Sequence, residues 1–308
     1  MRTVVLVIIL LHGIIHLAGF LKAFGLSDFR ELTLPIPRYL GIVWLITSAF
    51  FMVSGLMYIL KTQHWWIPGL IAVVFSQVLI IVFWQDARFG TIANVIILFI
   101  VFTGYKAWKF ENRYHDDVKK LVQSSSGTTD ELLNEKDLEH LPELVRKYII
   151  YTGALNKPKV KNLRAVFEAD MRGREQDWFT LTAEQHNSLE EPTRLFFLKA
   201  KVKGFPASGY HVYKDENAFM SVKLLSVFPV ANAAGEEMFK AETVTFFNDM
   251  CFLAPATLID QRIEWELLDS SSVKATFTNQ GVAISAVLYF DDEGRLINFK
   301  SEDRYDVN

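Results

Sequence analysis

Two histidines, His12 and His16, stand four residues apart in a stretch that has no acidic or basic side chain. At this spacing both imidazoles lie on one face of a helix. Imidazoles bind metals and haem and relay protons, so the pair is a candidate metal site or relay. The alternative is structural, with the rings hydrogen-bonding across a tight helix interface beside Gly13, and with Gln77 and Asn94 as partners. No Cys or carboxylate partner is evident at this depth, so the sequence predicts no particular cofactor.

Asp249 is the second candidate for chemistry, because it stands among large apolar residues: Phe246, Phe247, Met250 and Phe252. A carboxyl group in an apolar pocket has a raised pKa and can do acid–base work. The alternative is that Asp249 lies on the solvent side of an amphipathic helix. Gly-x-Ser-x-Gly, His-Glu-x-x-His, Cys-x-x-Cys and Gly-rich phosphate loops are absent from the sequence, and Cys251 is its single cysteine. We therefore do not expect an enzyme.

The 308 residues divide into two chemically different parts. Residues 1–105 carry nine of the 67 charged side chains, with a net charge of +3, and residues 106–308 carry the other 58, with a net charge of −6. Four uncharged apolar stretches in the first part are each long enough to cross a bilayer core of about 30 Å: 3–20, 39–60, 65–84 and 89–105. We expect a four-helix transmembrane domain over residues 1–110, with the lipid bilayer as its partner.

Lysine and arginine residues near the ends of these stretches predict the topology. One side of the membrane would carry seven of them and the other side four. This favours both termini in the cytoplasm and a multi-pass protein of a bacterial cytoplasmic membrane. The acidic second part lacks the basic surface that phosphate neutralisation requires, which excludes nucleic acid as a partner.

The second part shows a polar segment followed by strand-like patterns. Residues 111–139, with a Ser/Thr/Gly run at their centre, predict a flexible linker. A short helix is expected over 142–151, and after Pro158 apolar and polar residues alternate with period two between turn sequences. We expect an α+β protein in which residues 140–308 form one curved antiparallel sheet of about nine strands. A helical insert near 236–260 would cover one face of that sheet.

Several side chains of this domain could line a site for an apolar ligand beneath the insert. The candidate ligand-binding residues are Phe167, Phe179, Phe196, Phe219, Asp249, Trp265 and Phe277. The alternative is that these aromatic residues form an ordinary core.

The segment 141–148, the strand around Trp265, the sequence Tyr289-Phe290-Asp291 and the histidine pair resemble a family of uncharacterised bacterial membrane proteins. The outline of helix and meander is also similar to lipoprotein-carrier half-barrels, in which a curved sheet and helices enclose acyl chains. The second similarity implies a membrane-tethered module that binds a lipid or another apolar small molecule. A membrane redox or metal protein using His12 and His16, and a scaffold that recruits a partner protein, are the alternatives.

Overall fold

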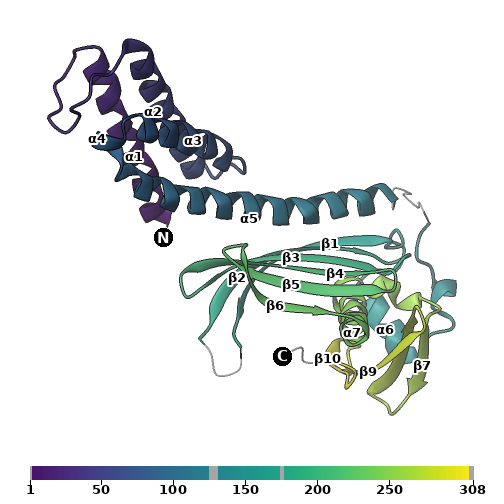
Figure 1. Cartoon of the computed structure of the whole chain (residues 1–308). Helices are drawn as coiled ribbons and strands as arrows, with labels where there is room; N and C mark the ends of the chain where they lie inside the picture. Colours follow the sequence, from purple (N-terminus) through teal and green to yellow (C-terminus); the bar gives the residue numbers. More distant parts are fainter. Residues whose placement is uncertain (1, 125–130, 174–176, 305–308) are drawn as a thin grey trace. The chain divides into compact units, whose positions relative to one another are not determined.

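The computed structural model describes residues 2–124, 131–173 and 177–304. It is an α+β structure with apolar helices in the N-terminal part and antiparallel sheets in the C-terminal part (Figure 1). The chain forms two compact units, Met1–Asn112 with Leu225–Val227, and Arg113–Leu224 with Phe228–Asn308.

The first unit is built from apolar helices. These are α1 (Arg2–Ala23), α2 (Arg38–Ile59), α3 (Trp66–Val82), the short α4 (Trp84–Ala87) and the first part of α5 (Gly90–Ser124). Among the described residues, α1, α2 and α5 are long and apolar enough to cross a membrane, and α3 is an apolar helix of 17 residues. The outer face of α1 is as apolar as its inner face, with Val4, Val7 and Leu11 more than half exposed. Such a helix has no polar face for water.

Small residues let α1 and α2 approach each other closely. A Cβ atom on Gly19 would lie 2.2 Å from Cδ2 of Trp44, so only glycine fits at this position. The buried seam of α1 otherwise holds Ile9, Gly13 and the two histidines. This packing of small residues against large ones is typical of helices that associate within lipid.

Helix α5 continues into the second unit as far as Ser124, so the first half of the predicted linker is helical. The reason is tertiary contact. Tyr114 is buried, stacks on Phe197 with 5.4 Å between ring centroids, and bonds through its hydroxyl to Nδ1 of His186 at 2.9 Å. Asp117 accepts a hydrogen bond from the Tyr210 hydroxyl at 2.9 Å. The Ser/Thr/Gly run of the predicted linker lies mostly at residues 125–130, outside the described residues, and a 3₁₀ turn, Glu135–Leu138, follows it.

The second unit contains two sheets where the sequence predicted one. Within the described residues, six antiparallel strands pair in chain order: β1 (Asn162–Met171), β2 (Phe179–Ser188), β3 (Thr193–Val202), β4 (Phe205–Lys214), β5 (Asn217–Leu224) and β6 (Phe228–Ala234). A separate sheet of four strands has the order β10-β9-β8-β7: β7 (Ile263–Leu267), β8 (Ser272–Asn279), β9 (Val282–Phe290) and β10 (Leu296–Lys300). The prediction of a single sheet of nine strands was wrong.

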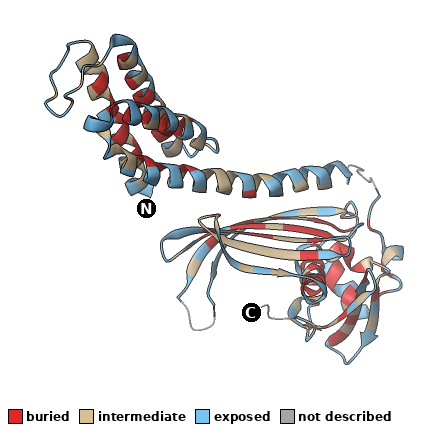
Figure 2. Ribbon diagram, viewed as in Figure 1, coloured by how far each residue is buried: buried red, intermediate tan, exposed pale blue. Residues whose placement is uncertain are grey.

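Helix α7 (Glu236–Leu253) explains this division, because it is the core element between the two sheets. Eleven of its 18 residues are buried, and Figure 2 shows this burial on the helix and on the strands beside it. Phe246 faces Tyr213 of the first sheet with 5.6 Å between ring centroids, and Phe247 stacks on Phe277 of the second sheet at 5.6 Å. A helix that is apolar on two sides needs an apolar surface on each side, so the strands after it form their own sheet.

Two further helical segments complete this core. Helix α6 (Glu143–Tyr151) contributes Val145 and Ile149, and its Tyr148 hydroxyl donates to the carbonyl oxygen of Cys251 at 2.7 Å. The 3₁₀ segment η2 (Pro255–Ile259) adds Leu258, which is fully buried.

Candidate functional site

The six-stranded sheet has two different faces, which follow from the alternation of side chains along each strand. On β2, Gln185 and Asn187 point toward α7, and His186 between them points toward α5. We call these the α7 face and the α5 face. Strand register places Phe179, Leu181 and Ala183 of β2 on the α7 face as well.

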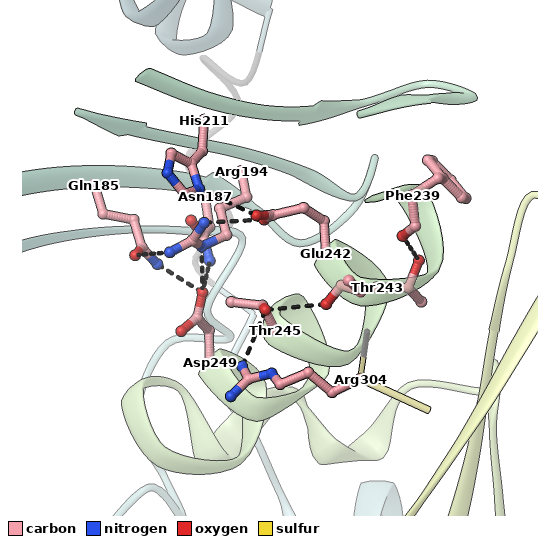
Figure 3. Close-up of polar contacts among 11 residues, drawn as sticks. Gln185, Asn187, Arg194, His211, Phe239, Glu242, Thr243, Thr245, Asp249 and Arg304 are labelled. Carbon is pink, nitrogen blue, oxygen red and sulfur yellow. Dashed lines mark hydrogen bonds and ion pairs between the residues drawn. The ribbon is translucent and has the colours of Figure 1, made fainter. Parts of the chain in front are cut away.

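A buried polar cluster joins the α7 face to α7 (Figure 3). Arg194 of β3 donates from Nε to Oδ2 of Asp249 at 3.0 Å, from Nη1 to Oε2 of Glu242 at 3.0 Å, and from Nη2 to Oε1 of Gln185 at 3.1 Å. Gln185 and Asn187 also donate to Oδ2 of Asp249, at 2.7 and 3.1 Å. One guanidinium group therefore pairs with two carboxylates, and the side-chain amides of Gln185 and Asn187 donate further hydrogen bonds to Asp249.

The two carboxyl groups of this cluster have pKa values shifted in opposite directions. Burial raises the pKa of Asp249, and this effect outweighs the charge of Arg194 and the bonds from the amides. Burial also raises the pKa of Glu242, but this effect is outweighed by the charge of Arg194 and by His211, whose Nδ1 lies 3.3 Å from Oε1 of Glu242. The pKa of Glu242 is therefore below its ordinary value. Burial thus favours the protonated form of Asp249, whereas the neighbouring cation favours the ionised form of Glu242.

The cluster keeps one unused hydrogen-bond acceptor. Asn187 is 1% exposed, its Nδ2 donates to Asp249, and its Oδ1 has no partner. Reversing this amide would place two oxygens against each other, so the bond to Asp249 fixes its orientation. One guanidinium group and two ionised carboxylates give Arg194, Glu242 and Asp249 together a net charge of −1.

Beyond the reach of α7, the same face of the sheet is apolar. Leu181, Ala183, Leu198 and Ala200 form a buried cluster separate from the main core, with Phe167, Phe179 and Phe196 packed on it. A hollow of about 1200 Å³ lies at this end, lined by residues 177–182, 199–203 and Pro206. At about 3.4 Å per residue, the strip from Phe179 to Gln185 is roughly 20 Å long. The apolar strip therefore runs from an open hollow to a closed polar end.

Phe196 lies where the strip meets the polar cluster. Its ring is 4.7 Å from Cζ of Arg194, 5.5 Å from the ring of His211 and 6.5 Å from the ring of Phe167. It is half-buried, and the His211 side chain beside it is 18% exposed. These two rings form the boundary between the apolar strip and the ion pairs.

The structure brings together four of the seven candidate ligand-binding residues. Phe167, Phe179 and Phe196 lie along the apolar strip, and Asp249 lies at its polar end. Phe219 is on the α5 face, where it meets Tyr210 edge-to-face at 5.8 Å. Phe277 is fully buried in the main core beneath α7, and Trp265 packs on that core from the second sheet.

Arg194, Gln185 and Asn187 were not among the residues predicted for the site, although the strand pattern contains a signal for them. The alternation that places Phe196, Leu198 and Ala200 on one face places Arg194 on the same face. A charged residue at a core-facing position needs a buried partner, which points to a polar cluster.

The histidine pair lies in a second polar network, inside the first unit. Nε2 of His12 is 2.9 Å from Oδ1 of Asn94, and Nδ2 of Asn94 donates to Oε1 of Gln77 at 3.0 Å. These bonds assign the proton of His12 to Nε2. Nδ1 of His16 donates to the backbone oxygen of His12 at 2.9 Å, and its Nε2 is buried without a partner.

The bonds of the histidine pair match the expected interface between helices. Among the described residues, no group of three or more His, Cys, Asp or Glu side chains could hold a metal ion. The metal and proton-relay hypotheses for His12 and His16 remain predictions.

These observations define the class of the protein: an apolar helical unit joined to an α+β domain of two antiparallel sheets that enclose a helix. Residues 131–308 match the family model DUF6544, a family of unknown function. The match covers more than half of the chain, so the protein belongs to this family. No curated protein and no solved structure matches the chain. The similarity to lipoprotein carriers therefore remains an expectation drawn from the outline of the fold.

Proposed function

We propose that the protein is a membrane-tethered module that binds one acyl chain, or an apolar molecule of similar shape, on the α7 face of the six-stranded sheet. The proposal rests mainly on the apolar strip, which lies outside the main core that α7 forms. Its side chains form a cluster of their own instead of joining the main core. An apolar strip that ends at a few polar groups suits such a ligand.

The dimensions of the strip support this class of ligand. The hydrocarbon core of a bilayer is about 30 Å thick, so an acyl chain in one leaflet spans about 15 Å. The strip is roughly 20 Å long and accommodates such a chain lengthwise. Strip residues of both β2 and β3 would contact it, and Phe196 with the polar cluster would set the limit of its depth.

The tether is the first unit. We propose that α1, α2, α3 and the first part of α5 cross the cytoplasmic membrane as four spans, with both termini in the cytoplasm. The shortest helix, α3, has 17 residues and reaches about 26 Å at 1.5 Å per residue, close to the thickness of the hydrocarbon core. A reporter fused to the C-terminus and active only outside the cytoplasm tests this orientation, and activity of that reporter would contradict it.

Photo-crosslinking of the full-length protein with a sixteen-carbon fatty acid that carries a diazirine tests the ligand. We expect crosslinks on Leu181, Ala183 and Leu198. The variant Ala183→Trp fills the strip and should lose them. Thr278→Trp, an exposed position on the second sheet, is the matched control and should keep them. An unchanged melting temperature would show that Ala183→Trp still folds.

Two results would contradict the proposal. One is crosslinking spread over the protein surface with no enrichment on the strip. The other is an unchanged yield in the folded Ala183→Trp variant. Native mass spectrometry of the purified protein adds an independent measurement, in which a co-purifying lipid is expected.

A further inference from the structure

The end of the six-stranded sheet at which the hollow opens has an unusual surface. Large apolar side chains are exposed there: Trp178 is 61%, Phe205 46% and Met171 45% exposed. They flank the connections between β1 and β2 and between β3 and β4, which lie at the same end of an antiparallel meander. Exposed tryptophan at the tip of a strand contributes nothing to the core and needs another explanation.

The charge at this end differs from the charge at the opposite end. Described residues 171–173, 177–179 and 199–206 carry four basic side chains and one acidic side chain, namely Arg172, Lys199, Lys201 and Lys203 against Asp177. Residues 187–194 and 213–218, at the other end, carry two basic and four acidic side chains. The domain is acidic as a whole, so the basic charge is concentrated at the mouth of the hollow.

Aromatic and basic groups are also combined within this surface. Cζ of Arg172 lies 4.7 Å from the centre of the Trp178 ring, in a cation–π contact. Trp178, Lys201 and Lys203 line the hollow itself. The rim of the candidate ligand site is therefore the same surface that presents the exposed tryptophan.

We propose that this rim docks on an anionic bilayer surface, so that the apolar strip opens onto the lipid. Tryptophan prefers the headgroup layer, and lysine and arginine are attracted by the anionic lipids of a cytoplasmic leaflet. A protein partner fits less well, because lysine is depleted in protein interfaces. The proposal rests on the proposed function for its biological role, but the docking itself does not depend on an occupied strip.

A fluorescent label at the rim tests docking in the full-length protein. Cys251 is fully buried, so a thiol-reactive dye attaches to an introduced cysteine. Asp177→Cys places the dye at the rim, and Glu191→Cys places it at the opposite end of the sheet. The protein is reconstituted in vesicles of phosphatidylcholine, with or without phosphatidylglycerol, that contain a lipid-attached quencher.

We expect quenching of the dye at position 177 only when phosphatidylglycerol is present, and no quenching at position 191. Each basic residue near an anionic surface strengthens binding about fivefold. Lys201→Gln with Lys203→Gln should therefore lower the ratio of docked to free rims by about 25-fold. The control pair Lys274→Gln and Lys300→Gln, exposed on the second sheet, should not change this ratio.

Three outcomes would overturn the proposal: equal quenching in vesicles without phosphatidylglycerol, equal quenching at positions 177 and 191, or quenching that survives the Lys201 and Lys203 substitutions. The Ala183→Trp variant separates the two proposals. It blocks the strip but leaves the rim intact, so quenching should persist while crosslinking of the fatty acid is lost. Quenching without any fatty-acid crosslinking in the unmodified protein would refute the proposed ligand and retain the docking surface.

Discussion

Among the described residues, Arg194 is the cation that donates hydrogen bonds to both Glu242 and Asp249, and replacing it with leucine removes both bonds. The two carboxyl groups are 5% and 8% exposed and would remain in place without a counter-charge. Breaking a buried ion pair by removing one partner typically costs about 3–5 kcal/mol, because a buried charge is left uncompensated. We expect Arg194→Leu to destabilise the contact between α7 and the sheet by about this amount at neutral pH.

The control is a surface pair of the same chemical type. Nε of Arg164 lies 2.7 Å from Oε1 of Glu184, and the Arg164 side chain is 61% exposed. Exposed pairs contribute little to stability, so Arg164→Leu should leave the stability nearly unchanged. Hydrogen exchange of the amides of α7 and β3 in the full-length protein measures the free energy of opening for each variant.

The loss in Arg194→Leu should depend on pH. The pKa of Asp249 is already raised by burial, so its folded form binds a proton more tightly than its unfolded form. Such a group adds stability below its unfolded pKa and loses this contribution as the pH rises through the folded pKa. Without Arg194 the upward shift of the Asp249 pKa grows, and the loss of stability in Arg194→Leu should therefore shrink as the pH falls from neutral.

Asp249→Asn in the Arg194→Leu background should recover part of the lost stability at neutral pH. Equal exchange rates in Arg194→Leu and Arg164→Leu would refute the electrostatic account.

Three further substitutions test other parts of the structure. Asn94→Leu removes the partner of His12 and should destabilise the helical unit by about 0.6–2 kcal/mol, measured by unfolding in detergent. Gly19→Ala places a Cβ atom 2.2 Å from the Trp44 ring and should cost about 1–3 kcal/mol in the same assay, and a neutral result would contradict the close packing. Tyr213→Phe removes a fully buried hydroxyl with two hydrogen-bond partners. Because a buried donor is left unsatisfied, protection of the α7 amides should fall by about 1–3 kcal/mol.

Local patterns in the sequence predicted individual elements well. Alternation placed Phe167, Phe179 and Phe196 on one face, because side-chain direction in a strand depends only on whether the residue number is odd or even within that strand. The same counting could have found Arg194. Apolar length predicted the helices of the first unit, although the third is three residues shorter than 65–84 and ends at Val82.

Long-range pairing was not predictable from these patterns. Phe219 alternates as regularly as Phe196, but the turn after Lys214 sets its register and directs it to the α5 face. Phe277 belongs to a second sheet because α7 needs apolar contacts on two sides, which depends on the packing of distant segments. Likewise, the polar sequence after Arg113 resembles a linker, and its helix persists because Tyr114 and Asp117 contact the sheet.

The distribution of charge along the apolar strip predicts the orientation of a bound fatty acid. At the closed end, Arg194 is already neutralised by two carboxylates, and the spare atom, Oδ1 of Asn187, is an acceptor. A carboxylate would meet net negative charge there, whereas the hollow at the other end is lined by the basic side chains Lys201 and Lys203. The ligand should therefore enter with its methyl end first. A diazirine near the methyl end should crosslink to Ala183 and Phe196, and a diazirine near the carboxyl end should crosslink to Phe179. The reverse pattern would show that the closed end binds the acid group, and it would require Asp249 to be protonated in the complex, since two ionised carboxylates at that distance repel each other.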